Sequence, residues 1–264
     1  MTLMIVLGVL AAMTAIMAAA WAFQRQVGES GWIDVFWTFG TGACLTVAAL
    51  VPAPSGARQL LVAGLVALWA LRLGTYVARR VASGPADARY VRLREQWGET
   101  YQRRLVALTL IQAPATALLA VSVVLAARRP GDSLQVTDFL GAAILLAAIA
   151  GEALADAQLA RFKADPANKG RIADAGLWGW SRHPNYFFEW MGWLAYPVIA
   201  FDPANPWSAL SLAAPLVMYL LLTRGSGLPP LEASMLASRG QAYVAYQARV
   251  SAFFPLPPRK GTPA

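Results

Sequence analysis

Residues 139–160, FLGAAILLAAIAGEALADAQLA, are long and apolar enough to cross a lipid bilayer as one helix, since the hydrocarbon core needs about 20 such residues. The only charged residues in this stretch are Glu152 and Asp156. They are four positions apart and therefore share one face of a helix. A charge at mid-helix costs about 2.5–3.5 kcal/mol against lipid, so both carboxylates are expected to face a partner or a polar cavity.

Six other stretches have the same apolar character. The sequence thus predicts seven transmembrane helices, at residues 3–23, 32–51, 59–78, 105–127, 139–160, 186–201 and 207–223. The chain is 58% hydrophobic and 14% charged, with a mean hydropathy of +0.48. Soluble domains carry about 25% charged residues, and disordered chains are more polar still. We therefore predict an all-α, polytopic membrane protein, with residues 1–264 forming a single domain and the Pro-rich residues 255–264 a loose end.

The basic residues predict the orientation of these helices. Arg58, Arg128 and Arg129 lie in one set of alternate loops, whereas 18 of the 22 Lys and Arg residues lie in the other set. Cytoplasmic loops carry the excess of Lys and Arg, so we expect an outside N-terminus and a cytoplasmic C-terminus. The net charge of +8 then reflects topology and attraction to the membrane surface rather than binding to nucleic acid.

Polar residues on three of the predicted helices suggest a common cavity. Glu152 and Asp156 are joined by two further pairs at the same four-residue spacing, Arg72 with Tyr76 and Asn185 with Glu189. Together these residues predict a polar cavity that opens to the cytoplasm. The alternative is that single charges lie near helix ends or pair only for packing.

The segment between the fifth and sixth predicted helices is basic. Lys163, Lys169, Arg171 and Arg182 suit phosphate binding, because Arg offers a bidentate fork and Lys a point charge. His183-Pro184-Asn185 is typical of a helix start, whose free N–H groups can meet an anion. The alternative is an ordinary basic cytoplasmic loop. His183 and Cys44 are the only residues of their types, so we expect no metal site and no disulfide framework.

Residues 176–190, GLWGWSRHPNYFFEW, resemble the signature shared by membrane sterol and steroid reductases. The stretch from Asp156 to Lys163 also fits, as do the residues Leu231, Glu232, Tyr243, Tyr246 and Arg249. Over about residues 30–255 the chain resembles a bacterial member of the steroid 5α-reductase family, with the strongest motifs between 150 and 250. The resemblance implies seven helices enclosing NADPH, with a steroid or related enone lipid entering from the bilayer. It also implies a multi-pass protein of the bacterial inner membrane, which we expect to be a monomer.

The resemblance and the cavity pattern together define a candidate cofactor pocket. Its expected members are Arg72, Glu152, Asp156, Lys163, Lys169, Arg171, Arg182, His183, Asn185, Tyr186 and Glu189, with Glu232, Tyr243 and Tyr246 as weaker candidates. In the animal enzymes a Gln–Glu pair and a Tyr hold the steroid 3-ketone. This chain has Ile33-Asp34 at the pair and Trp69 at the Tyr. Asp34 and Tyr76 are therefore the expected catalytic residues. The alternatives are a helix-start residue or a counter-ion of Arg72 for Asp34, and an interfacial aromatic for Tyr76.

The expected reaction is NADPH-dependent reduction of the Δ4 double bond of a 3-oxo steroid. Hydride would add to the β-carbon of the enone, and an acid near the carbonyl oxygen, such as Asp34 kept protonated by burial, would stabilise the enolate. A second family competes, because RHPNY followed by Leu231-Glu232 also resembles membrane methyltransferases of the isoprenylcysteine and phospholipid type, whose cofactor is S-adenosylmethionine. A non-enzymatic carrier or scaffold would explain the cavity but not the basic segment beside it.

Overall fold

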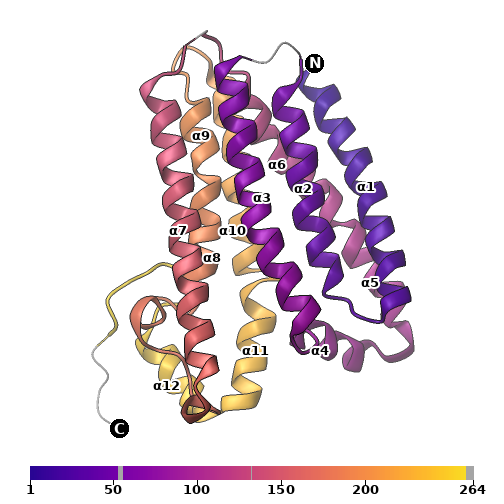
Figure 1. Ribbon diagram of the computed structural model, residues 1–264, viewed down its shortest axis with the longest axis vertical. Helices are drawn as coiled ribbons and strands as arrows, with labels where there is room; N and C mark the ends of the chain where they lie inside the picture. The colour runs from indigo at the N-terminus through magenta and orange to yellow at the C-terminus, as the bar shows by residue number, and fades with distance from the viewer. Residues whose placement is uncertain (53–55, 132, 260–264) are drawn as a thin grey trace. The chain divides into compact units, whose positions relative to one another are not determined.

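The computed structural model describes residues 1–52, 56–131 and 133–259, and this part of the chain is helical, with one isolated bridge between Ser181 and Ser251 (Figure 1). The helices are α1 (Thr2–Val27), α2 (Trp32–Leu50), α3 (Ala57–Ser83), α4 (Ala88–Trp97), α5 (Tyr101–Leu110), α6 (Gln112–Ala127), α7 (Val136–Ala164), α8 (Pro184–Trp193), α9 (Ala195–Ala200), α10 (Ala213–Thr223), α11 (Leu228–Arg239) and α12 (Gln241–Arg249). Four short 3₁₀ segments connect them: η1 (Gly98–Thr100), η2 (Pro166–Asn168), η3 (Gly176–Gly179) and η4 (Pro206–Leu212).

Six helical segments of the described chain are long and apolar enough to cross a membrane, which supports a multi-pass membrane protein. They are Thr2–Val27, Trp32–Leu50, Ala57–Ser83, Ala88–Ala127, Val136–Ala164 and Pro206–Arg239. The expected seventh span, residues 186–201, is not confirmed, because it consists of the short helices α8 and α9 separated at Leu194. Pro197 explains the break, since proline has no N–H to donate and its ring clashes with the carbonyl four residues earlier. Pro114 stands in the same relation to the break between α5 and α6.

The chain divides into two compact units that alternate along the sequence. Unit 1 comprises Met1–Ala143 and Leu194–Val217, and unit 2 comprises Ile144–Trp193 and Met218–Ala264. The expected single domain over residues 1–264 stays a prediction.

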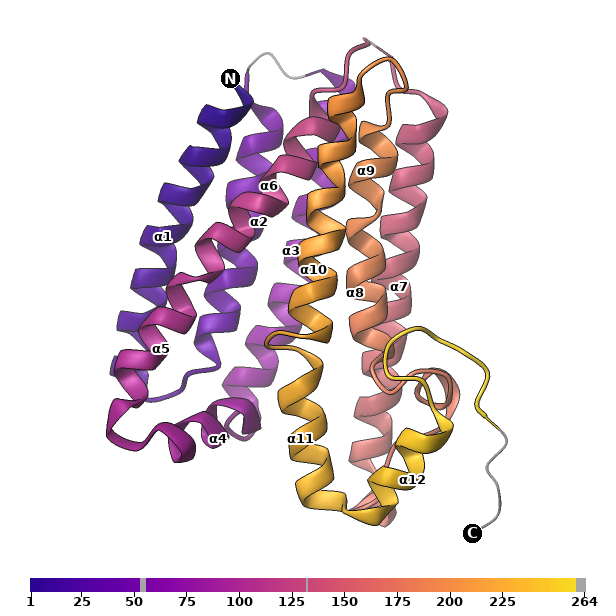
Figure 2. The same ribbon diagram turned by 180° about the vertical axis from the view of Figure 1, so that it is seen from behind.

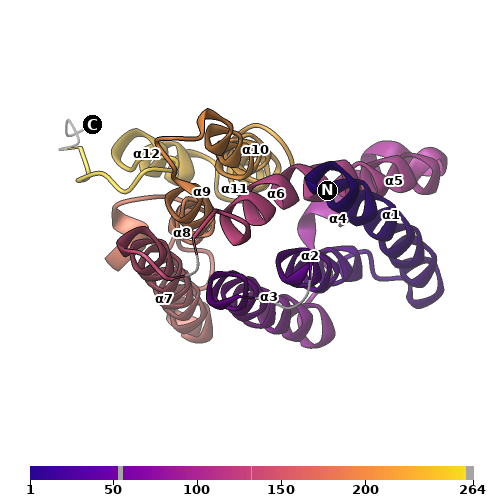
Figure 3. The same cartoon turned by 90° about the horizontal axis from the view of Figure 1, so that it is seen from above.

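In unit 1 the first three helices pack side by side, with α2 between α1 and α3 (Figure 3). Small residues allow the close approach of α2 and α3: a Cβ added to Gly42 would lie 2.1 Å from the Cβ of Ala70, and one added to Gly74 would lie 2.7 Å from the ring of Phe39. Membrane helices associate through such small residues because lipid leaves no hydrophobic force between them.

In unit 2 the second part of α7 packs against α8 in the same way. A Cβ added to Gly151 would lie 2.4 Å from the ring of Phe188. Further along the chain, α11 and α12 meet at Gly240, whose φ of +53° a side chain would rarely adopt (Figure 2). The close α7–α8 contact fixes the helix face that carries Glu152 and Asp156.

The chain after α12 is also ordered against unit 2. The N–H of Arg182 donates to the carbonyl of Ser251 at 2.8 Å, and the N–H of Leu256 donates to the carbonyl of Trp180 at 3.0 Å. The expectation of a loose end from residue 255 onward is therefore wrong for Leu256, and residues 260–264 lie outside the described part. These backbone hydrogen bonds hold the turn before α8, which contains the RHPNY motif.

Candidate functional site

The Glu232 cluster of unit 2 joins residues far apart in the sequence. The carboxylate of Glu232 on α11 accepts hydrogen bonds from Arg182 at 2.7 and 3.1 Å, from Nε2 of His183 at 3.1 Å and from the Gln247 side chain at 2.9 Å. Arg182 and His183 precede α8, and Gln247 lies on α12. Hence Glu232, a weak candidate in the sequence, is the centre of the cluster.

Main-chain contacts fix the turn that presents this cluster. Nη1 of Arg182 donates to the carbonyl of Val250 at 2.6 Å. The Ser181 hydroxyl donates to the carbonyl of Phe253 at 2.8 Å and accepts from the N–H of His183 at 3.1 Å. The His183 ring stacks on Tyr186 with the centroids 5.9 Å apart. The motif residues are therefore held in place by the segment that follows α12.

Two buried tyrosines of α12 lie behind the Glu232 cluster. Tyr243 and Tyr246 are 2% and 3% exposed, and the Tyr246 hydroxyl donates to the carbonyl of Trp178 at 2.6 Å. Burial, together with the negative charge of Glu232, raises the pKa of Tyr243 to about 12. Burial likewise raises the pKa of Tyr246 above its usual value. Both phenols are consequently neutral hydrogen-bond donors at physiological pH.

The acidic face of α7 lies beside α8. Glu152, Asp156 and Glu189 are buried. Asn185 donates to Oδ1 of Asp156 at 3.2 Å, and Nε1 of Trp193 donates to Oε1 of Glu189 at 3.0 Å. The structure thus brings Asp156 together with Asn185, and it pairs Glu189 with Trp193, both within unit 2.

The basic segment after α7 is largely exposed. Lys163, Lys169 and Arg171 are all exposed, and Arg171 donates to the Asn168 side chain at 3.3 Å. Beside this segment is a pocket of about 300 Å³, lined by Gln158, Arg161, Phe162, Ala173, Ala175, Gly176 and Trp178. Its lining is mainly apolar, with one cation at the rim.

Asp34 of unit 1 has partners that the sequence analysis did not single out. Its carboxylate accepts from Nη2 of Arg89 at 2.5 Å and from the Tyr90 hydroxyl at 2.9 Å, and Arg89 also binds Asp87. Asp34 lies in the first turn of α2, and its side chain is 23% exposed. The structure therefore pairs Asp34 with Arg89. Asp34 is a counter-ion, as one alternative proposed, but its partner at 2.5 Å is Arg89 and not Arg72.

Arg89 and Tyr90 lie on helix α4, which the sequence pattern had placed in a basic loop. Asp87 caps this helix by accepting from the N–H of Arg89 at 2.9 Å, and Gly98 ends it. An Asp before and a Gly after a ten-residue stretch are helix signals that could have revealed it. The Tyr76 ring, the other expected catalytic group, is covered by the Arg72 guanidinium at 5.5 Å.

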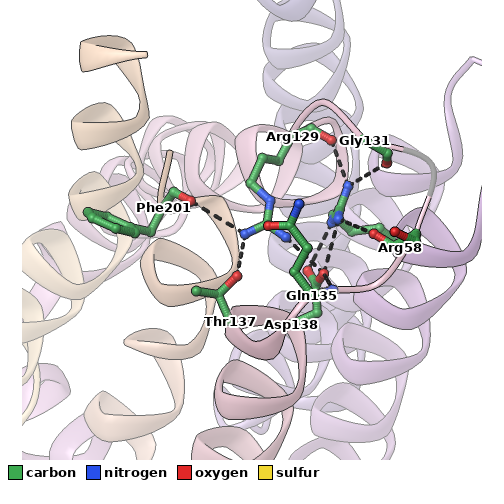
Figure 4. Close-up of polar contacts among 8 residues, drawn as sticks. Arg58, Arg129, Gly131, Gln135, Thr137, Asp138 and Phe201 are labelled. Atoms are coloured by element: carbon green, nitrogen blue, oxygen red, sulfur yellow. Dashed lines mark hydrogen bonds and ion pairs between the residues drawn. The ribbon is translucent and has the colours of Figure 1, made fainter. Parts of the chain in front are cut away.

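A third cluster, the Asp138 cluster, joins α3, α7 and the loop after α6 in unit 1 (Figure 4). Asp138 is fully buried and accepts from Arg58 at 2.9 and 3.1 Å and from Arg129 at 2.8 Å. Arg58 also donates to the carbonyls of Arg129, Gly131 and Ser133. From the sequence alone, Arg58 and Arg129 were expected to be charges of loops between the helices.

Comparisons with known proteins place the chain in a family. A model of the family described as "Protein of unknown function (DUF1295)" matches residues 20–250, and the chain belongs to this steroid 5α-reductase-like family. No curated protein and no solved structure matches the chain. Among the described residues, no group of three or more His, Cys, Asp and Glu side chains could hold a metal ion.

Proposed function

We propose that the protein is an NADPH-dependent reductase that saturates the Δ4 double bond of a 3-oxo steroid, or of a related enone lipid, within the membrane. The observation that carries this proposal is the Glu232 cluster, in which Arg182 and His183 of the reductase-like motif meet residues of α11 and α12. A cluster built from three separated segments indicates a shaped site rather than a loop that is basic only for topology.

The donor set of unit 2 fits a dinucleotide phosphate. Lys163, Lys169 and Arg171 are exposed and offer charge-assisted donors to phosphate oxygens. The 300 Å³ pocket beside them, with Phe162 and Trp178 in its lining, has the apolar walls that a nucleotide base prefers. When bound, NADPH would supply the hydride. The protein residues would hold its phosphates, orient it and exclude water.

The carbonyl site belongs to unit 1 in this proposal. Negative charge develops on the substrate carbonyl oxygen during reduction, and a donor aimed at that atom stabilises the transition state more than the ground state. Because both oxygens of Asp34 accept hydrogen bonds, Asp34 is better suited to orient the Tyr90 hydroxyl and Arg89 than to donate itself. Tyr76 stays a second candidate for the donor.

The proposal includes a topology. The excess of Lys and Arg in one set of loops supports an outside N-terminus and a cytoplasmic C-terminus. The location in the bacterial inner membrane rests on the resemblance to bacterial members of the family. The exposed basic segment 163–171 then faces the cytoplasm, where NADPH is available. A cysteine-accessibility scan at the two ends would test this topology independently of activity.

A cofactor screen tests the proposed function. Purified full-length protein in detergent is heated with NADPH, with NADH, with S-adenosylmethionine or without cofactor, and NADPH alone should raise the unfolding temperature. Turnover is then followed as loss of NADPH absorbance with progesterone as a 3-oxo-Δ4 substrate and its saturated product as the control. Stabilisation by S-adenosylmethionine alone would favour the methyltransferase, and stabilisation by none of the three would favour a carrier or scaffold.

A further inference from the structure

The Asp138 cluster borders a pocket that the proposed reductase activity does not use. This pocket of unit 1 has a volume of about 170 Å³ and lies where α6 and α9 end. Its lining includes Arg128, Arg129, Asp202, Asn205 and Ser208. Since one water occupies about 30 Å³ of liquid, the pocket has room for several waters or for a polyatomic ion.

Two arginines of the lining have buried nitrogens without a hydrogen bond. Nη1 of Arg128 and Nε of Arg129 are buried and have no hydrogen-bond partner among the described residues. The rest of the Arg129 guanidinium is engaged by Asp138, Thr137 and the carbonyl of Phe201 (Figure 4). A buried donor left unsatisfied is costly. Neither nitrogen has appreciable accessible surface of its own, so an acceptor in the pocket would gain these two donors through a small shift of the arginine side chains that line it.

The charge around the pocket is positive on balance. Among the described lining residues, Arg128 and Arg129 are cationic and Asp202 is anionic. Asp138 is shared by Arg58 and Arg129, so it has little capacity left for Arg128. The next carboxylate along the chain, Asp132, lies outside the described residues and is treated in the experiment below.

We propose that this pocket binds a phosphate-type oxyanion, either the phosphate of a lipid headgroup or free inorganic phosphate. Guanidinium groups recognise such anions through parallel N–H donors. Arg128 and Arg129 both line the pocket, and each has one nitrogen that no described residue uses. The Asn205 and Ser208 side chains add polar lining. The pocket lies at the end of the apolar segment Ala88–Ala127, a position suited to the headgroup layer of a bilayer.

The test measures anion affinity directly. Purified full-length protein in phosphate-free detergent is titrated with inorganic phosphate, and in parallel with dihexanoyl phosphatidylglycerol, at constant ionic strength, with binding followed by thermal shift and calorimetry. The variant Arg128→Gln should weaken binding by about 10-fold or more, the scale of one charge-assisted hydrogen bond. The exposed Arg103→Gln on α5 is the matched control and should stay within about 2-fold.

For a second variant, Asp202→Asn, we expect the opposite change in anion affinity. Asp202→Asn removes a negative charge from the lining, keeps an acceptor for the N–H of Ala204, and should tighten anion binding. Binding by the phospholipid alone would assign the site to a headgroup, and binding by both would assign it to phosphate in general. The proposal fails if neither binds, if Arg128→Gln binds as the wild type does, or if binding appears only after Asp132→Asn. In that last case the chain's own carboxylate would fill the pocket.

Discussion

The carboxylates of Asp138 and Glu232 are each shared by two cationic or potentially cationic side chains, but they differ in access to solvent. Asp138 of unit 1 binds Arg58 and Arg129, and its side chain is 0% exposed. Glu232 of unit 2 binds Arg182 and His183, and its side chain is 20% exposed. The same charge pattern therefore occurs once in a sealed setting and once in an open one.

The two clusters also differ in their other hydrogen bonds: Arg58 of the Asp138 cluster donates to main-chain carbonyls, whereas Glu232 binds side chains. Arg58 donates to three loop carbonyls and so ties the start of α3 to the segment between α6 and α7 (Figure 4). Glu232 instead binds the side chain of Gln247 and the titratable ring of His183. A sealed carboxylate acts mainly on folding, whereas a partly open one can exchange its partners with a ligand. Burial, rather than the residue types, distinguishes the two roles.

The largest effect is expected at the sealed cluster. Asp138→Asn leaves two buried arginines without their shared counter-charge, and breaking a buried pair costs about 3–5 kcal/mol. We expect the free energy of unfolding in detergent to fall by that amount, measured by denaturant titration.

Two matched variants sharpen this first prediction. Asp174→Asn breaks an ion pair with Arg249 whose side chains are nearly half exposed, and should cost at most about 1 kcal/mol. Glu232→Gln should destabilise less than Asp138→Asn, since solvent can reach its partners. Equal losses for Asp138→Asn and Glu232→Gln would remove the distinction between a sealed and an open cluster.

The carboxylate of Asp34 is shared by Arg89 and the Tyr90 hydroxyl, and its exposed fraction of 23% is close to that of Glu232. Asp34→Ala removes the acceptor of Arg89 and Tyr90, so turnover of progesterone should fall on the order of 10²-fold, the scale of losing an oxyanion donor. NADPH affinity should be nearly unchanged. The readouts are kcat from steady-state absorbance and Kd from NADPH fluorescence.

Single substitutions of Tyr90 and Tyr76 identify which hydroxyl donates a hydrogen bond to the substrate carbonyl oxygen. If the hydroxyl that Asp34 orients is the donor, Tyr90→Phe should reproduce most of the Asp34→Ala defect, while Tyr76→Phe should leave kcat nearly intact. The reverse pattern would move the donor to Tyr76. A defect confined to NADPH affinity would instead make Asp34 part of the cofactor pocket.

The sequence could predict most of the membrane-spanning helices and the membrane class because both follow from local composition. Four of the seven predicted spans coincide with the single helices α1, α2, α3 and α7. Residues 105–127 form part of Ala88–Ala127, and residues 207–223 form part of Pro206–Arg239; each of these longer segments contains more than one helix. The one left unconfirmed, 186–201, contains Pro197, whose effect on the preceding turn is readable in the sequence but was not weighed. The distribution of Lys and Arg predicts a topology that no contact in the structure tests.

The clusters were harder to predict, since their partners are distant in sequence. The four-residue spacing of Glu152 and Asp156 indicated one helix face correctly, whereas Asp34 meets Arg89 across 55 residues and Glu232 meets Arg182 across 50. Long-range pairing depends on how helices pack, which hydropathy does not encode. Only a resemblance to a known family suggested that Glu232 and Arg182 act together.

The basic segment after α7 should show a smaller effect than the shared carboxylates. Lys169→Ala and Arg171→Ala each remove an exposed cation without breaking a buried pair, so stability should change little. A direct phosphate contact is worth about 1–3 kcal/mol, and each variant that makes one should weaken NADPH binding accordingly. Arg103→Ala on α5 is the control. Unchanged NADPH affinity in both variants would leave the segment a topological signal only.

The last effect appears only at alkaline pH and concerns the contribution of Tyr243, beside the open carboxylate, to the free energy of unfolding. Its pKa is raised from 10 to about 12 by burial and by the charge of Glu232, so the folded state favours the neutral phenol. That contribution to stability is complete below pH 10 and is lost as the pH rises from 10 to 12. The stability of the wild type relative to Tyr243→Phe should therefore decline across this window, while the other tyrosines cancel in the difference. In a Glu232→Gln background the negative charge is absent, so the pKa of Tyr243 should be raised less. The pH range over which the stability difference declines should then end closer to pH 10. A difference that stays flat from pH 9 to 12 would show that the pKa of Tyr243 is not raised at all. An unchanged window in the Glu232→Gln background would show that burial alone raises it and that Tyr243 does not sense Glu232.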